Sequence, residues 1–407
     1  MDSVAATVNQ ILDDIRDHGL AKALEYTARY DNISLSPGEV LWDVEAEPPA
    51  KVPTAQKDAM DFAARQIRQF HESTQPVSVR VEQAPGLTLT ERMVPLDRVG
   101  IYVPNGQYPL ISSLFMTAIP AQVAGVRDLA VAIAPKALGK TDPLWIYALQ
   151  SLGIKTVLRL GGAQAIAALG YGFEGFQGVD LIAGPGNQYV AEAKQELFRR
   201  KVAGIDVVAG PSEVLVIASA GAPAEVVAMD LLAQAEHAAD AHAYLVSWDQ
   251  DLMGQVEQYV TAAREKTSAP LGPTEWVLVS SPEQAVAFAN RTAPEHLGLI
   301  GREAEALAPQ IRTAGALFVG WLAGQALGDY VAGPSHVLPT GGTGRFLPGL
   351  STRTFTRRMS VIEAREDLPD EFLAAGQVLA ALEGLQYHER SLQCRQQQRT
   401  AARQVPS

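Results

Sequence analysis

Three consecutive stretches decide the fold: EVLVIAS (213–219), EVVAMDLLAQAEH (225–237) and AYLVSW (243–248). The outer two are short and rich in β-branched residues, and the middle one is an Ala-rich helical stretch. Such alternation is typical of parallel sheets covered by helices on both faces. It continues on both sides, so we predict eight strands, over 128–135, 156–161, 179–184, 213–219, 243–248, 276–281, 297–301 and 316–320.

The strands fall into two blocks, 128–211 and 213–320, which predicts an α/β protein with two lobes. Residues 1–75 are expected to be mostly helical, because their apolar positions recur at spacings of three and four. Ser281 followed by Pro282 and Gln284 predicts the start of a helix. The polar tail, 369–404, reads as helices with little core of their own, which would need a partner surface.

Bulk properties favour a small-molecule ligand. A net charge of -12 and a pI near 5.1 count against nucleic acid, which requires clustered Lys and Arg. No apolar run approaches the roughly 18 residues of a membrane helix, and the start lacks a targeting pattern, so a cytoplasmic protein is expected. The single cysteine, Cys394, cannot form an internal disulfide.

Four short strings carry unusual concentrations of ligand-type side chains, and together they hold four of the seven histidines: AQAEH (233–237), APEHL (293–297), GDYVAGPSH (328–336) and EGLQYH (383–388). A buried polar group without a partner costs about 1–3 kcal/mol. We therefore hypothesise a metal site beside an acid/base pair.

Two of the strings suggest metal ligands. Gln234 and His237 lie three apart in a helical stretch and so share a face, although a solvated helix face is the alternative. Asp329 and His336 flank a Gly/Pro turn of the kind that aims side chains, although an Asp that caps a turn and an exposed His explain the pattern equally. Oxygen and imidazole donors of this kind suit Zn²⁺ with open positions.

The other two strings are less specific. Glu295 and His296 stand between a helix and a strand and form a competent proton-transfer pair, provided that Pro294 allows the chain to bend there. A purely structural role remains open for this pair. Glu383 and His388 lie near the end of an apolar helical stretch, where simple surface exposure is the alternative.

Two Gly-rich segments, 159–170 and 183–193, each place a glycine turn before a helix, where phosphate is commonly bound. Neither matches G-x-G-x-x-G, since Tyr189 stands where the third glycine belongs, so the dinucleotide signal is weak.

Taken together, these strings resemble the histidinol dehydrogenase family, whose members are zinc- and NAD-dependent. The matching stretches run in order along nearly the whole chain, among them EYTARYDNISL (25–35), PLDRVGIYVPNG (95–106), GGAQAIAALGYG (161–172), AGPSEVLVIA (209–218), NRTAPEHL (290–297) and RRMSVIE (357–363).

The resemblance implies the NAD-linked four-electron oxidation of L-histidinol to L-histidine via histidinal, by a homodimer with shared active sites. The fold it implies is two incomplete Rossmann-like lobes with parallel-sheet cores and small helical terminal extensions. It divides the chain into residues 1–101 (helices and the first part of lobe 1), 102–211 (lobe 2, in contact with NAD), 212–350 (the rest of lobe 1, with the metal and catalytic residues) and 351–407 (an extension that reaches the dimer partner).

The resemblance also implies the role of each site residue. His296 would be the base, and Glu295 would activate water. Zinc would be held by Gln234, His237, Asp329 and, from the partner subunit, His388. The substrate site would contain Ser212, Gln234, His237, His296, Asp329, His336, Glu383 and His388. NAD would contact Tyr102, Gln164 and Asn187.

Several positions depart from the family pattern and leave the substrate open: Ala233, Ser335, Asn105, Gly341 and Gly342, together with an N-terminus short for the family. One alternative is a paralogue that oxidises another polar alcohol or diol, such as a sulfonated propanediol. Another is a catalytically silent metal-binding or scaffold protein. A thiohemiacetal route would use the only cysteine, six residues past His388, so attack by water is favoured.

Overall fold

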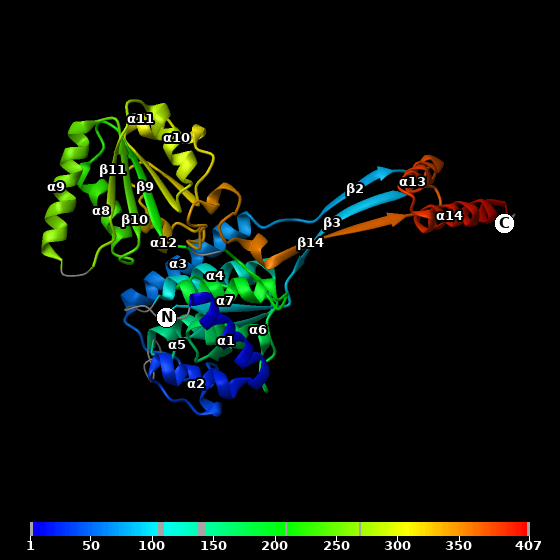
Figure 1. Ribbon diagram of the computed structural model, residues 1–407, viewed down its shortest axis with the longest axis horizontal. Helices are drawn as coiled ribbons and strands as arrows, with labels where there is room; N and C mark the ends of the chain where they lie inside the picture. Colours follow the sequence, from blue (N-terminus) through cyan, green and yellow to red (C-terminus); the bar gives the residue numbers. More distant parts are fainter. Residues whose placement is uncertain (1–2, 105–109, 137–142, 208–209, 268–269, 405–407) are drawn as a thin grey trace. The chain divides into compact units, whose positions relative to one another are not determined.

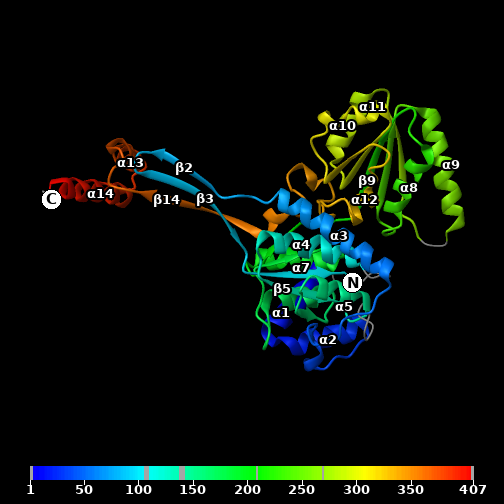
Figure 2. The ribbon, with the colours of Figure 1, turned by 180° about the vertical axis from the view of Figure 1, so that it is seen from behind.

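The computed structural model describes residues 3–104, 110–136, 143–207, 210–267 and 270–404. The chain forms two compact units (Figures 1 and 2). The first unit comprises Met1–Gln75 and Pro95–Phe355, and the second comprises Pro76–Val94 and Thr356–Ser407. Over the described ranges, no helix is both long and apolar enough to span a bilayer.

The first sheet of the first unit has six strands, in the order β1 (Leu41–Asp43), β6 (Thr156–Leu158), β5 (Asp128–Ile133), β4 (Arg98–Val103), β7 (Leu181–Ala183) and β8 (Gly204–Ile205). Only β1 is antiparallel to its neighbour. One face packs on α3 (Thr54–Ser73), α4 (Ile111–Ala124) and α5 (Pro143–Ser151). The other packs on α1 (Val4–His18), α2 (Leu20–Asp31), α6 (Gly162–Tyr171) and α7 (Gln188–Arg199).

The second sheet has five parallel strands, in the order β11 (Thr274–Leu278), β10 (His242–Ser247), β9 (Glu213–Ala218), β12 (His296–Ile300) and β13 (Ala316–Val319). Successive residues of β9 face opposite sides. Val214 and Val216 pack with α8 (Ala224–Ala235) and α9 (Gln250–Lys266), whereas Leu215 and Ile217 pack with α10 (Pro282–Thr292) and α11 (Arg302–Glu305) (Figure 1). Burial on both faces explains the continuous apolar run of EVLVIA.

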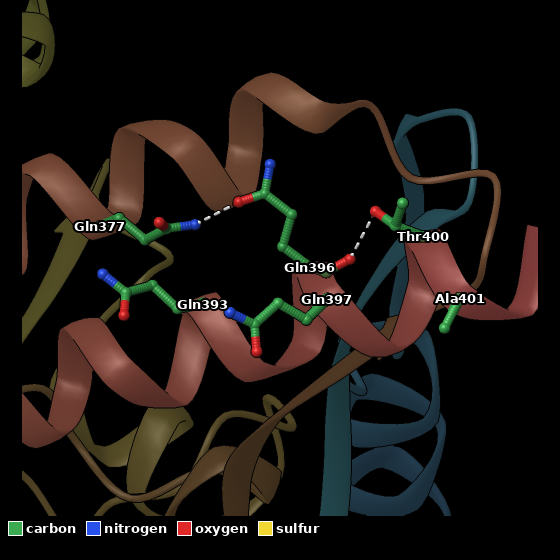
Figure 3. A pocket seen from close by; sticks show the side chains of 6 residues that line it. All are labelled: Gln377, Gln393, Gln396, Gln397, Thr400 and Ala401. Carbon is green, nitrogen blue, oxygen red and sulfur yellow. Dashed lines mark hydrogen bonds between the residues drawn. The ribbon is translucent and has the colours of Figure 1, made fainter.

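The second unit joins two distant parts of the chain. Its three-stranded sheet has the order β14 (Thr356–Ala364), β3 (Leu87–Pro95) and β2 (Val79–Ala84), followed by α13 (Asp370–Leu382) and α14 (Gln386–Gln404). Leu373 and Ala380 are the buried residues of α13. A cavity of about 560 Å³ opens between α13 and α14, and amide side chains line most of it (Figure 3). The prediction that the tail has little core of its own agrees with this packing.

The short elements complete the fold. In the described residues they are α12 (Gln325–Tyr330) and the 3₁₀ turns η1 (Pro37–Glu39), η2 (Ala308–Gln310), η3 (Thr343–Arg345) and η4 (Thr352–Phe355).

The predicted α/β class with two parallel-sheet lobes is confirmed, and each of the eight predicted strands is present. The Ser281 cap is also confirmed, because its hydroxyl accepts a hydrogen bond from the Gln284 N–H. The strands β1, β2, β3, β4, β8 and β14 were not predicted.

The structure groups the domains differently from our predicted boundaries. The boundary between residues 101 and 102 falls inside β4. The helices α1, α2 and α3 pack on the six-stranded sheet, so residues 1–75 lie with 102–211 rather than with 212–350. Residues 76–94 pair with the segment after residue 355, because β3 hydrogen-bonds to β14.

Candidate active site

The predicted catalytic residues lie at the amino edge of the five-stranded sheet. His296 opens β12 and pairs in register with Val214 of β9 and Ala316 of β13. Side chains of paired residues point to the same face, so His296 lies on the face that α8 covers. Its ring is 5.9 Å from the ring of Phe318 on the same face.

The chain bends sharply just before His296. Helix α10 ends at Thr292 and is capped by Ala293, whose φ of 47° is left-handed, and Pro294 follows. The predicted bend is thus present, although Ala293 makes it together with Pro294. It lets Glu295 accept a hydrogen bond of 3.1 Å from the Glu213 N–H and another from the Ser212 hydroxyl, while His296 enters the strand.

The imidazole of His296 is held between two carboxylates. Its Nε2 atom is 3.5 Å from Asp329 Oδ1, and its Nδ1 atom is 3.8 Å from Glu295 Oε2. His296 is only 3% exposed, and neither ring nitrogen has a hydrogen-bond partner within the described part of the chain. The ring therefore lies between two acids, with one nitrogen facing each carboxylate.

Burial and charge act in opposite directions on this group. Burial alone would lower the pKa of His296, but the carboxylates of Asp329 and Glu295 outweigh it and raise that pKa. Burial raises the pKa of Glu295 against the opposing effect of His296. Burial would also raise the pKa of Asp329, yet His296 and the charges of His336 and His237 hold it below its ordinary value. A His/Glu pair of this kind can exchange protons near neutral pH.

Asp329 reaches the site from α12 rather than from a loop. We expected GDYVAGPSH to be a Gly/Pro loop throughout, but Gly328, Asp329 and Tyr330 form the last turn of α12. A Cβ on Gly328 would lie 2.7 Å from the Phe318 ring, so glycine allows the helix to approach β13. His336 follows in the loop, where its Nδ1–H donates to the Asp329 carbonyl oxygen at 2.8 Å, and burial lowers its pKa.

Gln234 is the most deeply buried of the predicted metal ligands. It lies on the buried face of α8, is 0% exposed, and neither its amide oxygen nor its amide nitrogen has a hydrogen-bond partner among the described residues. The prediction that Gln234 and His237 share a helix face is wrong, because α8 ends at Ala235 and His237 lies in the turn beyond it. The His237 N–H donates to the Gln234 carbonyl oxygen at 3.2 Å, which keeps the two residues adjacent.

This donor set fits a divalent metal. An unpaired buried amide costs free energy unless a ligand satisfies it, and Asp329 supplies a carboxylate in the electric field of three imidazoles. In the described ranges, no three His, Cys, Asp or Glu side chains of one chain form a ligand cluster.

The predicted cofactor residues gather at the carboxyl edge of the six-stranded sheet. Tyr102 lies near the end of β4, where burial raises its pKa to about 12 and its hydroxyl accepts from the Gly162 N–H at 3.1 Å. Gln164 is 2% exposed in α6 and donates to Asp31 at 3.4 Å. Asn187 caps α7, with its side-chain oxygen accepting from two backbone amides.

The position of these residues suits a dinucleotide. Strand β4 has β5 on one side and β7 on the other, so the chain order reverses beside Tyr102. In open α/β sheets, ligands bind at the carboxyl ends of strands beside such a reversal.

Two expected ligands lie in the second unit. Glu383 caps the carboxyl end of α13, and Gly384, with a φ of 73°, separates it from α14, which carries His388. We expected both residues near the end of one helix, but Glu383 caps α13 and His388 lies in α14. Both side chains are exposed.

The positions that depart from the family pattern have different roles. Ser335 is a buried structural residue, because its hydroxyl donates to the Met116 carbonyl oxygen at 2.9 Å and accepts from the Val337 N–H. Gly341 donates its N–H to Glu213 at 2.9 Å. Gly342 has a φ of 73°, and Ala233 is half-buried in α8. Asn105 lies outside the described residues.

Two residues near these sites escaped prediction. Glu213 positions Glu295 through its main-chain N–H and holds Gly341 through its carboxylate. An acidic residue at the start of the apolar run EVLVIA was the available signal. Asp31, at the end of α2, binds Gln164, and nothing in the sequence pattern marked it.

Comparison with known proteins defines the family. The model of the histidinol dehydrogenase family matches residues 1–396. The chain belongs to this family. The histidinol dehydrogenase of Gluconobacter oxydans is 40% identical over 402 residues, which cover 97% of this chain and 93% of that protein. That of Cereibacter sphaeroides is 41% identical, with 96% and 92% covered.

Solved structures agree with the family assignment. The crystal structure of histidinol dehydrogenase from Elizabethkingia anophelis matches with a TM-score of 0.90 and 31% identity, over 98% of this chain and 93% of that one. An acetylating aldehyde dehydrogenase from Geobacillus thermoglucosidasius matches with a TM-score of 0.53 at 13% identity, which shows a shared fold only. As a histidinol dehydrogenase family member, the chain is an oxidoreductase.

Proposed function

We propose that this enzyme oxidises L-histidinol to L-histidine via histidinal, with NAD and a bound zinc ion, in histidine biosynthesis. The observation that carries the proposal is the position of His296, buried between Glu295 and Asp329 on the sheet face that α8 covers, the helix that holds the unpaired amide of Gln234. A base beside a metal-type donor set can support alcohol oxidation, because the base takes the hydroxyl proton and the metal orients the substrate.

His296 and Glu295 have separate tasks. In the first step, His296 accepts the proton of the substrate hydroxyl as the carbon–hydrogen bond breaks. In the second, Glu295 accepts a proton from the water that attacks the aldehyde carbon, and the hydrated aldehyde then loses its own hydride. The Glu213 N–H and the Ser212 hydroxyl hold the Glu295 carboxylate in place for this role.

The proposed metal ligands are Gln234, His237, Asp329 and His388 of the partner subunit. Zinc, when bound, supplies a Lewis acid that orients the substrate. His336, whose Nδ1–H is used by the Asp329 carbonyl oxygen, keeps Nε2 for the substrate, which Ser212 and Glu383 would also contact. Two of these residues come from the exposed part of the second unit, so we propose a homodimer with shared sites.

Tyr102, Gln164 and Asn187 are proposed to contact NAD. When bound, NAD supplies the hydride acceptor. Asn187 uses its side-chain oxygen to cap α7, which leaves its NH₂ group free to donate to the cofactor. The exposed apolar residues of the second unit support the dimer, since surfaces of this kind mark interaction sites; they include Ile362, Val378, Leu379, Leu382 and Tyr387.

The test is steady-state turnover of the zinc-loaded protein with NAD and either L-histidinol or a sulfonated propanediol. Turnover of L-histidinol with a stoichiometry of two NADH per product supports the proposal. Turnover of the diol alone would assign the paralogous activity. Turnover of neither substrate by protein that retains one metal per chain would favour a silent scaffold.

A further inference from the structure

Among the ion pairs of the described residues, the least exposed one lies outside the catalytic group. Lys194 of α7 and Asp206, just after β8, form an ion pair whose side chains are 2% and 0% exposed. Removing two charges from water costs several kcal/mol per ion, and such pairs are frequently no more stable than apolar replacements. We therefore ask which part of the backbone this ion pair holds in place, rather than how much stability it adds.

Both members of the pair bind the same backbone unit. Lys194 Nζ donates to the Gly184 carbonyl oxygen at 2.9 Å, and the Gly184 N–H donates to Asp206 Oδ2 at 2.7 Å. One ion pair thus satisfies the donor and the acceptor of a single residue. Gly184 follows β7 directly, so the pair fixes the exit of the chain from the sheet.

The turn that begins at Gly184 tolerates little movement. Gly184 has a φ of 116°, and a Cβ there would lie 2.1 Å from the Tyr102 carbonyl oxygen. A Cβ on Gly186 would lie 2.2 Å from Val190. The turn ends at Asn187, which caps α7. Its two ends are therefore set against Tyr102 and the start of α7, both parts of the expected nucleotide site.

We propose that Lys194 and Asp206 are positioning residues that hold the 184–187 turn in the conformation that receives the pyrophosphate of NAD. This inference rests on the proposed cofactor. The pair acts through Gly184 and does not itself touch the dinucleotide. Anions bind more tightly to the backbone N–H groups of a turn that precedes a helix when those groups are already oriented.

The test variant is Lys194→Met/Asp206→Leu, which removes both charges together and leaves no unpaired ion. Deuterium uptake is measured without nucleotide for a peptide that covers residues 183–190, and the Kd for NAD is measured by calorimetry on the metal-loaded protein. We expect faster uptake in this peptide, a Kd raised at least about tenfold, and an unchanged kcat at saturating NAD. Lys194→Met/Asp206→Asn also leaves no unpaired ion and keeps an oxygen for the Gly184 N–H, so it should give a smaller rise in Kd and answers the question if the first double variant does not fold.

The matched control is Arg200→Met, just beyond the other end of α7. Arg200 binds Asp13, Glu196, Asn9 and Tyr171 but not Gly184. It should lower the thermal midpoint and leave both the 183–190 uptake and the Kd for NAD unchanged. Wild-type uptake and Kd in the double variant would overturn the inference, as would an equal effect of Arg200→Met. If the wild-type protein does not bind NAD, the proposed cofactor fails, and the exchange measurement alone decides whether the pair positions the turn.

Discussion

Acid should destabilise the first unit through His71. This residue lies in α3, is 1% exposed, and neither ring nitrogen has a hydrogen-bond partner in the part of the chain that the structure describes. Burial lowers its pKa from 6.5 to about 4. Because the unfolded chain binds the proton first as the pH falls, stability is lost below pH 6.5 and the loss is complete below pH 4.

The magnitude follows from these two pKa values. Between pH 7 and pH 5, protonation of the unfolded imidazole removes about 2 kcal/mol of the unfolding free energy. His71→Leu replaces the ring with an apolar side chain that does not titrate. We therefore expect the wild-type protein to lose about 2 kcal/mol more than this variant over that pH range.

Urea unfolding followed by tryptophan fluorescence is a suitable assay, since Trp145 belongs to the apolar core that also includes Ile67 of α3. The exposed His18→Leu variant, which removes a different imidazole and leaves His71 in place, serves as the control. An equal loss of stability in the wild-type and His71→Leu proteins would refute the reasoning, because it would show that the ring is not kept neutral by burial.

Four further variants have expected outcomes. His296→Asn should lower kcat by about 10²–10⁴-fold while metal content is retained. Glu295→Gln should slow oxidation of the aldehyde more than oxidation of the alcohol. Steady-state kinetics with each substrate checks both variants, and full activity in either would contradict the role assigned to that residue. Gln234→Ala should weaken zinc binding in a competition titration with a chelator, and unchanged affinity would exclude Gln234 as a ligand. Gly184→Ala should lower the thermal midpoint by several degrees, because its Cβ would clash with a backbone oxygen, whereas Gly175→Ala, with a φ of 84° but open space, should cost much less.

The sequence predicted the strands of both sheets well where burial on two faces makes a run continuously apolar, as in β9 and β12. The central strand β4 was not predicted, because its sequence RVGIYV directly follows the polar hairpin formed by β2 and β3. The strands β2 and β14 have largely exposed residues and therefore lack an apolar pattern.

The candidate site was only partly predictable. The pair Glu295 and His296 stood out as a dipeptide at an element junction, and its bend was foreseen. The approach of Asp329 to His296 depends on the register of β12 beside β13 and on the packing of Gly328 against Phe318, which no local pattern reveals. Helix α8 ends at Ala235, and His237 lies in the turn that follows. The spacing of three between Gln234 and His237 was therefore wrongly interpreted as a shared helix face.

The sheet of the second unit has a consequence for synthesis. Strand β3 has β2 on one side and β14 on the other, yet β14 is translated only after both large sheets of the first unit. Until then, the edge of β3 that β14 later covers is open, and such edges pair readily with foreign strands. A protein shortened before residue 356 would keep that edge permanently, so it is expected to aggregate even though the residues of both large sheets remain intact.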